Sequence, residues 1–232
     1  MKHIIKRGQP HDLQLWFNEQ PIEDGRRINC DYRSMPNDVK HIVKQQLILE
    51  QGGLCCYTGL RITAQKSHIE HFKPQSRCQN YEDVDYNNLL AAYPGNDIQN
   101  CPYGAHPKAG DELPISPLNE DSERRFHFDL DGQIAPLQET DQGAKETIRI
   151  LNLCHNSLTE MRQQAIESAL LQGNRKPSDA QLRRIIEGYC QRDAKQLFKP
   201  FCFVIVQAAQ ELLELVARER KKKQYSRSQE RK

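Results

Sequence analysis

The chain has 232 residues, of which 37% are hydrophobic and 28% charged, a composition typical of a globular protein that is long enough to bury a core. No apolar run approaches the ~18 residues of a transmembrane helix, and residues 1–12 lack the apolar segment of a secretory signal, so we expect a cytoplasmic protein without a membrane partner. The net charge of +2 is uneven, because residues 218–232 hold eight Lys/Arg and two Glu, a net of +6, which leaves −4 for the remainder. Such a basic tail is typical of nucleic-acid contact, and equally of a solvated helix end.

Local patterns in the first half of the chain predict one helix and short extended segments. Apolar residues recur at helical spacing within residues 36–51, and Gly52 and Gly53 end that helix. Residues 54–63 are predicted as a short strand and a tight turn at Thr58-Gly59, and residues 67–72 as a second strand ended by Pro74. Residues 75–88 are expected to be a loop, followed by a brief apolar run over residues 89–93 and a short helix around Ala105.

The second half is predicted to be a hairpin followed by helices. Residues 125–137 resemble a hairpin that turns at Asp131-Gly132. Four helical patterns then follow with short links, over residues 143–154, 156–172, 178–198 and 200–223. The sequence therefore predicts an α+β protein with a loop-rich front half and a helical C-terminal half.

The eight cysteines leave two interpretations open. In a reducing compartment we expect no disulfide framework, and packed, reduced cysteines are the default. Four of them could converge on a structural Zn²⁺, namely Cys55, Cys56, Cys78 and Cys101. Thr58 stands where a Cys-x-x-Cys pair would place its second sulfur, so the spacing does not require zinc.

The stretch SHIEHFKPQ, residues 67–75, is the densest group of chemistry-bearing residues. On an extended segment His68 and Glu70 lie on one face, because side chains alternate along a strand. A divalent metal could bind Glu70 and a nearby imidazole, which would leave His71 to act on water. Downstream, Asn88 and His106 can brace the base and complete the metal site.

With LCCYTG, DYNNLL and CPYGAHPKAGD, this stretch resembles the HNH endonucleases, and among them the PtuB-type nucleases of Septu and retron antiphage systems. The resemblance covers about residues 54–117. It implies a ββα-metal finger in the front half, one divalent cation and cleavage of phosphodiester bonds. Many relatives carry two Cys-x-x-Cys pairs, which Thr58 and the region around Tyr93 interrupt here.

The resemblance also implies a role for each matched residue. His71 matches the general base and Asn88 the asparagine that braces the loop or orients the base. Glu70 matches the acidic metal ligand, His106 the metal ligand on the finger helix, and His68 a further group near the metal. Two other residues are candidate contacts to substrate phosphate, Lys108 and Arg77. The expected metal is Mg²⁺, with Mn²⁺ as an alternative.

The resulting hypothesis divides the chain into four parts: a helical lead-in (1–53), the nuclease region (54–140), a helical partner-docking region (141–217) and the basic tail (218–232). The expected function is metal-dependent cleavage of nucleic acid, with DNA favoured over RNA. The resemblance implies an ATPase partner of the PtuA type and, in retron systems, a reverse transcriptase with its RNA and DNA. The alternative is a non-catalytic nucleic-acid-binding or adaptor protein that keeps the finger as a scaffold.

Overall fold

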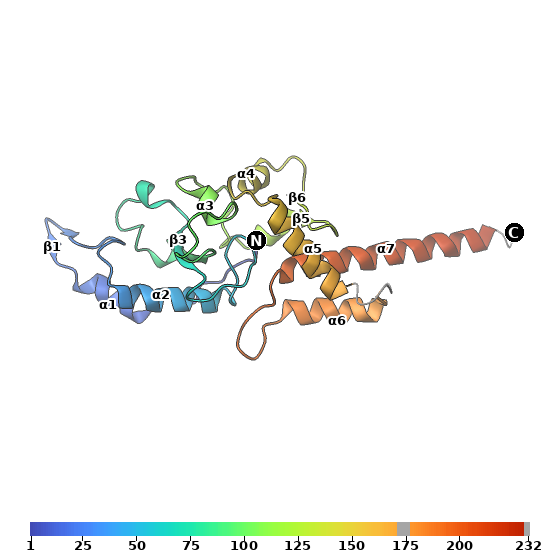
Figure 1. The fold of residues 1–232 in the computed structure, drawn as a ribbon, viewed down its shortest axis with the longest axis horizontal. Helices are drawn as coiled ribbons and strands as arrows, with labels where there is room; N and C mark the ends of the chain where they lie inside the picture. Colours follow the sequence, from blue (N-terminus) through green and yellow to red (C-terminus); the bar gives the residue numbers. More distant parts are fainter. Residues whose placement is uncertain (171–176, 230–232) are drawn as a thin grey trace.

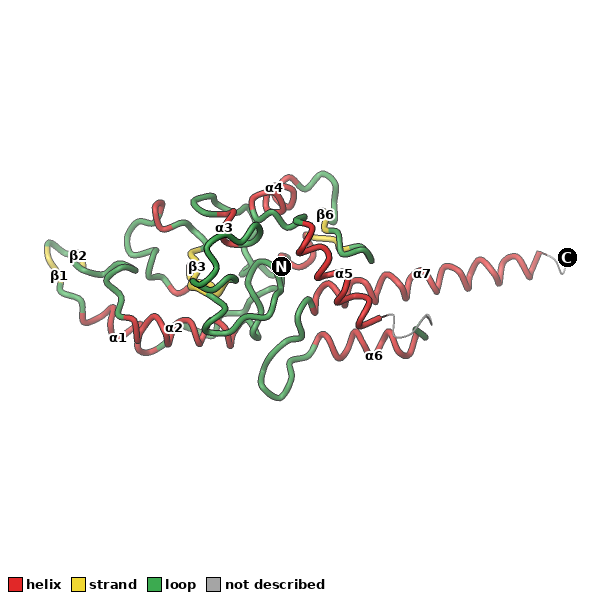
Figure 2. The backbone as a smooth tube through the Cα atoms, viewed as in Figure 1, coloured by secondary structure: helices red, strands yellow, loops and turns green. Residues whose placement is uncertain are grey.

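The computed structural model describes residues 1–170 and 177–229, and it has a mixed α+β architecture with helices at both ends of the molecule, the longest of them towards the C-terminus (Figures 1 and 2). The described strands form three separate antiparallel pairs, β1–β2, β3–β4 and β5–β6. In chain order the elements are α1 (His11–Glu19), β1 (Ile22–Glu23), β2 (Arg26–Arg27), α2 (Asn37–Glu50), β3 (His68–His71), β4 (Leu89–Ala92), α3 (Ala105–Lys108), β5 (Phe126–Phe128), β6 (Ile134–Pro136), α4 (Gln142–Ile150), α5 (Asn156–Leu170), α6 (Asp179–Cys190) and α7 (Cys202–Gln229).

Most of the predicted elements are present. The helix expected within residues 36–51 is α2, the short helix near Ala105 is α3, and the four helical patterns of the second half correspond to α4 to α7. The third of these patterns, residues 178–198, is helical only over α6, and residues 191–198 form no helix. The predicted hairpin is β5–β6. Residues 171–172 of one predicted helix and residues 230–232 of the tail lie outside the described residues.

The strand predicted over residues 54–63 is not formed in the structure. Residues 54–63 contain only an isolated bridge between Leu54 and Arg61, and the partner of β3 is β4, which the sequence presented as a brief apolar run. All four residues of β4 are buried, so the strand shows none of the alternation by which half-buried strands are recognised. The order β3, β4, α3 is strand, strand, helix; whether it is a ββα-metal finger stays a prediction, as do the four proposed chain divisions.

The β3–β4 pair is held against the front core by α2. Val39, Val43 and Leu47 are buried at spacings of four residues, so one face of α2 is apolar. At the end of this helix, the side chain of the buried Gln51 bonds to β4 as a neighbouring strand would. Its Oε1 accepts from the Ala91 N–H at 2.7 Å, and its Nε2 donates to the Ala91 carbonyl at 2.8 Å. The same Nε2 donates to the Leu54 carbonyl. These bonds fix β4, and through it β3, on the helix.

The end of α2 requires glycine. Gly52 and Gly53 have φ of +60° and +69°, a region that L-residues avoid. A Cβ on Gly52 would also lie 2.4 Å from the Phe198 ring. The two glycines therefore let the chain reverse tightly enough to place Gln51 beside β4.

The helical half packs around the first part of α7, while the remainder of α7 extends away from the body towards the C-terminus (Figure 1). Inside this half, Arg162 is buried and donates to the Gly132 and Leu153 carbonyls, so that α5 is tied to the β5–β6 turn. None of the helices in residues 1–170 and 177–229 is both long and apolar enough to cross a membrane.

We predict that Gln51→Leu destabilises the fold by about 2–4 kcal/mol, because the Ala91 N–H and the Leu54 carbonyl each lose a buried partner. Urea unfolding followed by circular dichroism measures this change. Gln45→Leu, at an exposed position of the same helix, is the matched control and should shift stability by less than about 0.5 kcal/mol. Equal effects of the two substitutions would contradict the role given to Gln51.

Candidate active site

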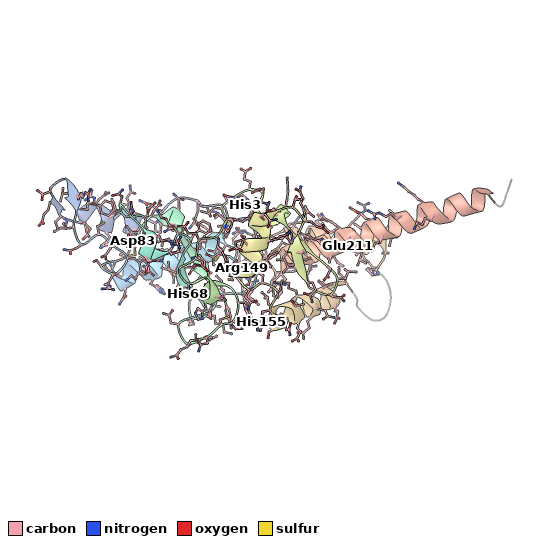
Figure 3. All side chains as sticks on the ribbon, turned by 90° about the horizontal axis from the view of Figure 1, so that it is seen from above. His3, His68, Asp83, Arg149, His155 and Glu211 are labelled. Carbon is pink, nitrogen blue, oxygen red and sulfur yellow. The ribbon has the colours of Figure 1, made fainter. Side chains whose placement is uncertain are left out.

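The predicted site residues of SHIEHFKPQ lie on β3, where alternation sends them to two faces. His68 and Glu70 share one face, with 3.5 Å between His68 Nε2 and Glu70 Oε2. His71 points to the opposite face and packs edge-on against Tyr32. Figure 3 shows His68 and Asp83 in the half of the molecule away from α7. Residues that are adjacent in the chain therefore lie in separate environments on the two faces of β3.

Glu70 is an ionised carboxylate in a nearly buried position. Its Oε1 lies 2.9 Å from Lys108 Nζ and accepts a hydrogen bond from the Tyr57 hydroxyl at 3.2 Å. Burial alone would raise the pKa of Glu70, but the hydrogen bond from His68 and the charge of Lys108 outweigh burial and lower the pKa. Glu70 is therefore charged at neutral pH, as a metal ligand or an ion-pair partner must be.

His68 has its ring orientation fixed by the backbone. Its Nδ1 lies 2.6 Å from the Pro94 carbonyl, which can only accept, so Nδ1 carries a proton. Burial disfavours the charged imidazolium, but the bonds to Glu70 and Pro94 outweigh it and raise the pKa of His68. When protonated, His68 donates from Nε2 to Glu70; in the neutral ring the proton stays on Nδ1, and Nε2 has the lone pair that a cation would need.

His71 is 8% exposed and has a defined tautomer. Its Nε2 lies 2.8 Å from the Asp83 carbonyl, closer than the Gln75 amide nitrogen at 3.4 Å, so Nε2 donates to the carbonyl and Nδ1 is the basic nitrogen. Burial lowers the pKa of His71 more than the Asp83 carbonyl raises it. The imidazole is therefore neutral at neutral pH, which is the state a general base needs.

Asn88 braces the loop that follows β3. Its Oδ1 accepts from the Lys73 N–H at 2.7 Å, and its Nδ2 donates to the Lys73 carbonyl at 3.2 Å and the Glu82 carbonyl at 2.9 Å. Both ends of residues 73–82 are thereby held together. Since Glu82 precedes Asp83, Asn88 also positions the carbonyl that orients His71. No bond joins Asn88 to His71 in the described structure, so its contribution to the base is indirect.

His106, on α3, lies near His68, with 6.1 Å between the ring centroids. Its Nδ1 accepts from the Cys101 N–H at 3.0 Å, so in the neutral ring the proton is on Nε2. Burial, followed by the charge of His68, lowers the pKa of His106. His106 therefore lies beside the pair His68–Glu70, but neither of its ring nitrogens has a lone pair free to bind a cation.

The two residues predicted to contact phosphate lie in contrasting places. Lys108 is 1% exposed, and its Nζ donates to the His71 carbonyl at 2.9 Å as well as pairing with Glu70. The structure thus directs this ammonium into the protein instead of towards a substrate. Arg77 is exposed and forms a 3.4 Å ion pair with the exposed Glu112. Its phosphate contact stays a prediction.

Of the candidate zinc cysteines, Cys55 and Cys56 share a side-chain hydrogen bond, and Cys55 also interacts electrostatically with Cys101. Cys55 is buried and its Sγ accepts from the Tyr93 N–H at 3.3 Å, whereas Cys78 Sγ lies 3.4 Å from Asn88 Nδ2. Cys101 is buried and its Sγ contacts the Tyr103 carbonyl at 3.3 Å. Within the described ranges no three His, Cys, Asp or Glu side chains gather as a metal-binding group. Structural zinc stays a prediction.

The spacing of the donor atoms of His68 and Glu70 decides whether a catalytic divalent cation fits between them. Two ligand atoms bound at about 2.1 Å to one ion stand roughly 3.0–3.4 Å apart, close to the 3.5 Å between His68 Nε2 and Glu70 Oε2. Of the three predicted ligands, His68 and Glu70 therefore fit a shared cation. His106 could join them only if its hydrogen bond from the Cys101 N–H were broken. Lys108 contacts the other oxygen, Oε1.

Sequence reasoning missed the groups that support the site. Tyr57 hydrogen-bonds to Glu70, Asp83 orients His71 through its backbone, and Tyr32 packs on the His71 ring. A backbone carbonyl leaves no mark in side-chain identity, so Asp83 could not be found from the pattern. Tyr32 lies 39 positions before His71, with only tertiary structure to join them.

A comparison with protein-family profiles finds no family that matches this chain, and a comparison with curated proteins finds no matching sequence. The assignment of a function therefore depends on the geometry described above and on the motifs of the sequence.

We predict that Lys108→Met destabilises the protein by about 3–5 kcal/mol at pH 7, because it leaves the Glu70 carboxylate buried without its ammonium partner. Glu70 has a lowered pKa in the folded protein, so its pairing contributes stability above its unfolded pKa and loses it as the pH falls through the folded value. The deficit of the variant should therefore shrink on acidification, as Glu70 becomes neutral.

Urea unfolding of both proteins at pH 7 and at about pH 4 measures this difference. The exposed Lys145 of α4 supplies the control, Lys145→Met, which should unfold like the wild type. A Lys108→Met deficit that does not change with pH would show that lost packing, and not lost charge pairing, causes it.

Proposed function

We propose that this protein is a metal-dependent endonuclease of the HNH type that hydrolyses phosphodiester bonds of nucleic acid. The observation that carries the proposal is the arrangement on β3. His71, a neutral imidazole with one nitrogen fixed by a carbonyl, follows the pair His68–Glu70 directly in the chain but on the opposite face of β3, and the donor atoms of that pair are spaced for one cation. The motif resemblance supports the same reading.

In the proposed reaction, His71 Nδ1 takes a proton from a water molecule as the water oxygen attacks the phosphorus. The P–O bond to the 3′ oxygen breaks, and that oxygen acquires a proton from solvent. The Asp83 carbonyl stabilises the imidazolium that forms, because it accepts from Nε2–H throughout. General-base assistance of this kind is commonly worth about 10²–10⁴-fold in rate.

His68 and Glu70 are the residues that would hold the cation. When bound, a divalent metal supplies Lewis-acid stabilisation of the charge on the phosphate and on the departing oxygen. A carboxylate is a hard ligand suited to Mg²⁺ or Mn²⁺, whereas an imidazole also suits Mn²⁺ and Zn²⁺. With Lys108 on Oε1, Glu70 has its second oxygen directed towards His68.

A second candidate function is a non-catalytic nucleic-acid-binding or adaptor protein. The observation in its favour is Lys108, since the ammonium already neutralises Glu70 and makes the carboxylate part of a buried ion pair. In that case the same residues would stabilise a scaffold. Loss of His71 would then leave the biological effect intact.

The partners proposed from the resemblance are an ATPase of the PtuA type and, in a retron setting, a reverse transcriptase with its nucleic acids, as part of antiphage defence. The helical half is the proposed docking region. In its favour, α7 projects beyond the helices that pack on it, and Leu215 on α7 is 41% exposed (Figure 1). Cytoplasmic location belongs to the same proposal.

We predict that the protein cleaves plasmid DNA or total tRNA with Mg²⁺ or Mn²⁺, that EDTA stops cleavage, and that His71→Ala lowers the rate by about 10²–10⁴-fold through loss of the base. Gel assays with the protein alone, and with any ATPase encoded beside it, measure this. Because the His71 ring is buried, His71→Asn provides a second test with a polar side chain of smaller volume change.

The control is His127→Ala, a half-buried histidine of β5 far from the site in sequence and on a different sheet. This variant should cleave at the wild-type rate. Cleavage that survives in both His71 variants would exclude His71 as the base. If the wild-type protein has a biological effect in cells and the His71→Ala variant keeps that effect, the non-catalytic scaffold function is favoured.

A further inference from the structure

A groove of about 710 Å³ opens between α2 and the edge of the candidate active site. One wall is the polar face of α2, the floor is the start of β3, and the opposite wall is the loop after β4. Lys40 and Lys44 line it on the α2 side, and His68, Asn96, Gln99 and His106 line it on the other side.

The α2 wall presents its polar residues as one stripe. Positions 37, 40, 41 and 44 recur at spacings of three and four, so they lie on one helical face, opposite in character to the buried stripe of Val39, Val43 and Leu47. The spacing was visible in the sequence, but nothing local indicates that this face borders β3. Only the fold brings Lys40 and Lys44 to the site.

The groove is positive and contains no carboxylate among its lining residues. Lys40 Nζ lies 3.4 Å from the Arg33 carbonyl and 4.8 Å from the centre of the Tyr32 ring, and Lys44 Nζ lies 3.4 Å from the Ser67 carbonyl. In residues 1–170 and 177–229, neither ammonium forms an ion pair. Two cations are thus held at the groove by neutral groups, with their charge uncompensated.

The facing loop is held close and offers neutral amide groups, and it also carries Asp97, whose Oδ1 would lie 2.8 Å from a Cβ at Gly95. A Cβ at Gly95 would lie 2.1 Å from the Gln65 carbonyl oxygen, so the chain passes here only because the residue is glycine. Asn96 and Gln99 follow on this loop and line the groove opposite the lysines. Amide groups of this kind can hydrogen-bond to phosphate or sugar oxygens.

We infer that this groove binds the phosphodiester backbone of a nucleic-acid strand, with Lys40 and Lys44 as phosphate contacts, and leads it to the edge formed by His68 and His106. Uncompensated lysines in a concave surface attract phosphates without reading the base sequence. Binding here serves cleavage only if the proposed nuclease function holds, but the binding itself does not depend on it. The basic tail is a separate candidate, since α2 and the end of α7 lie at opposite ends of the molecule (Figure 1).

The test measures binding without cleavage, in EDTA and in a His71→Ala background, by fluorescence anisotropy with labelled single-stranded DNA, duplex DNA and RNA. The groove variant is Lys40→Gln/Lys44→Gln. We expect it to weaken binding of every sequence alike and to lower the slope of log Kd against log salt by about 1 per lysine, about 2 in all. Comparison of the three probes identifies the class of strand bound.

Two double variants remove the same charge elsewhere. Lys145→Gln/Lys195→Gln changes exposed lysines of α4 and of the loop before α7, and should leave affinity and slope unchanged. Lys221→Gln/Lys222→Gln tests the tail. The inference is overturned when the groove variant binds with the affinity and slope of the Lys145/Lys195 control, or when only the tail variant loses binding.

Cleavage by the same variants with His71 restored separates this inference from the proposed function. Normal binding by the groove variant together with intact cleavage would overturn the groove and leave the nuclease. Groove-dependent binding by a protein that does not cleave under any condition would support the groove and overturn the nuclease.

Discussion

The ammonium of Lys108 joins the two elements on which the candidate site is built. It is buried, and it bonds at once to the Glu70 carboxylate and to the His71 carbonyl, so α3 is fixed against β3 at two consecutive residues. An ammonium out of water is tolerated only with such partners, since its desolvation is costly. The position of His106 beside His68 follows from this contact, because both His106 and Lys108 lie on α3.

The division of tasks on β3 follows from strand geometry. One face carries His68 and Glu70, and the other carries His71, whose environment is completed by the Asp83 carbonyl and the Tyr32 ring. A charged pair and a neutral imidazole can therefore be neighbours in sequence without sharing a hydrogen bond. The structure keeps them in these states by different means, since ionic partners lower the pKa of Glu70 while burial lowers that of His71. The loop that supplies Asp83 depends in turn on the three backbone bonds of Asn88.

Sequence patterns predicted the elements that carry strong periodicity or turn signals, namely α2, the helices of the second half and the β5–β6 hairpin. They failed at β4, where four consecutive buried residues resemble any short apolar run, so the strand that pairs with β3 was not predicted. The candidate residues of SHIEHFKPQ could be named from their types alone. The burial of Lys108 could not, because lysine is ordinarily a surface residue and its partner lies 38 positions earlier in the chain. The groove was also missed, since its lysines and its histidines belong to distant segments.

In the proposed function, His68 and Glu70 form a cation site and not merely a structural ion pair with Lys108. Anomalous diffraction from crystals of the His71→Ala protein soaked in Mn²⁺ tests it directly. A cation site predicts one manganese peak in contact with both His68 Nε2 and the Glu70 carboxylate. Data that show Mn²⁺ elsewhere or nowhere, with Glu70 held only by Lys108, Tyr57 and His68, would contradict it and favour the scaffold.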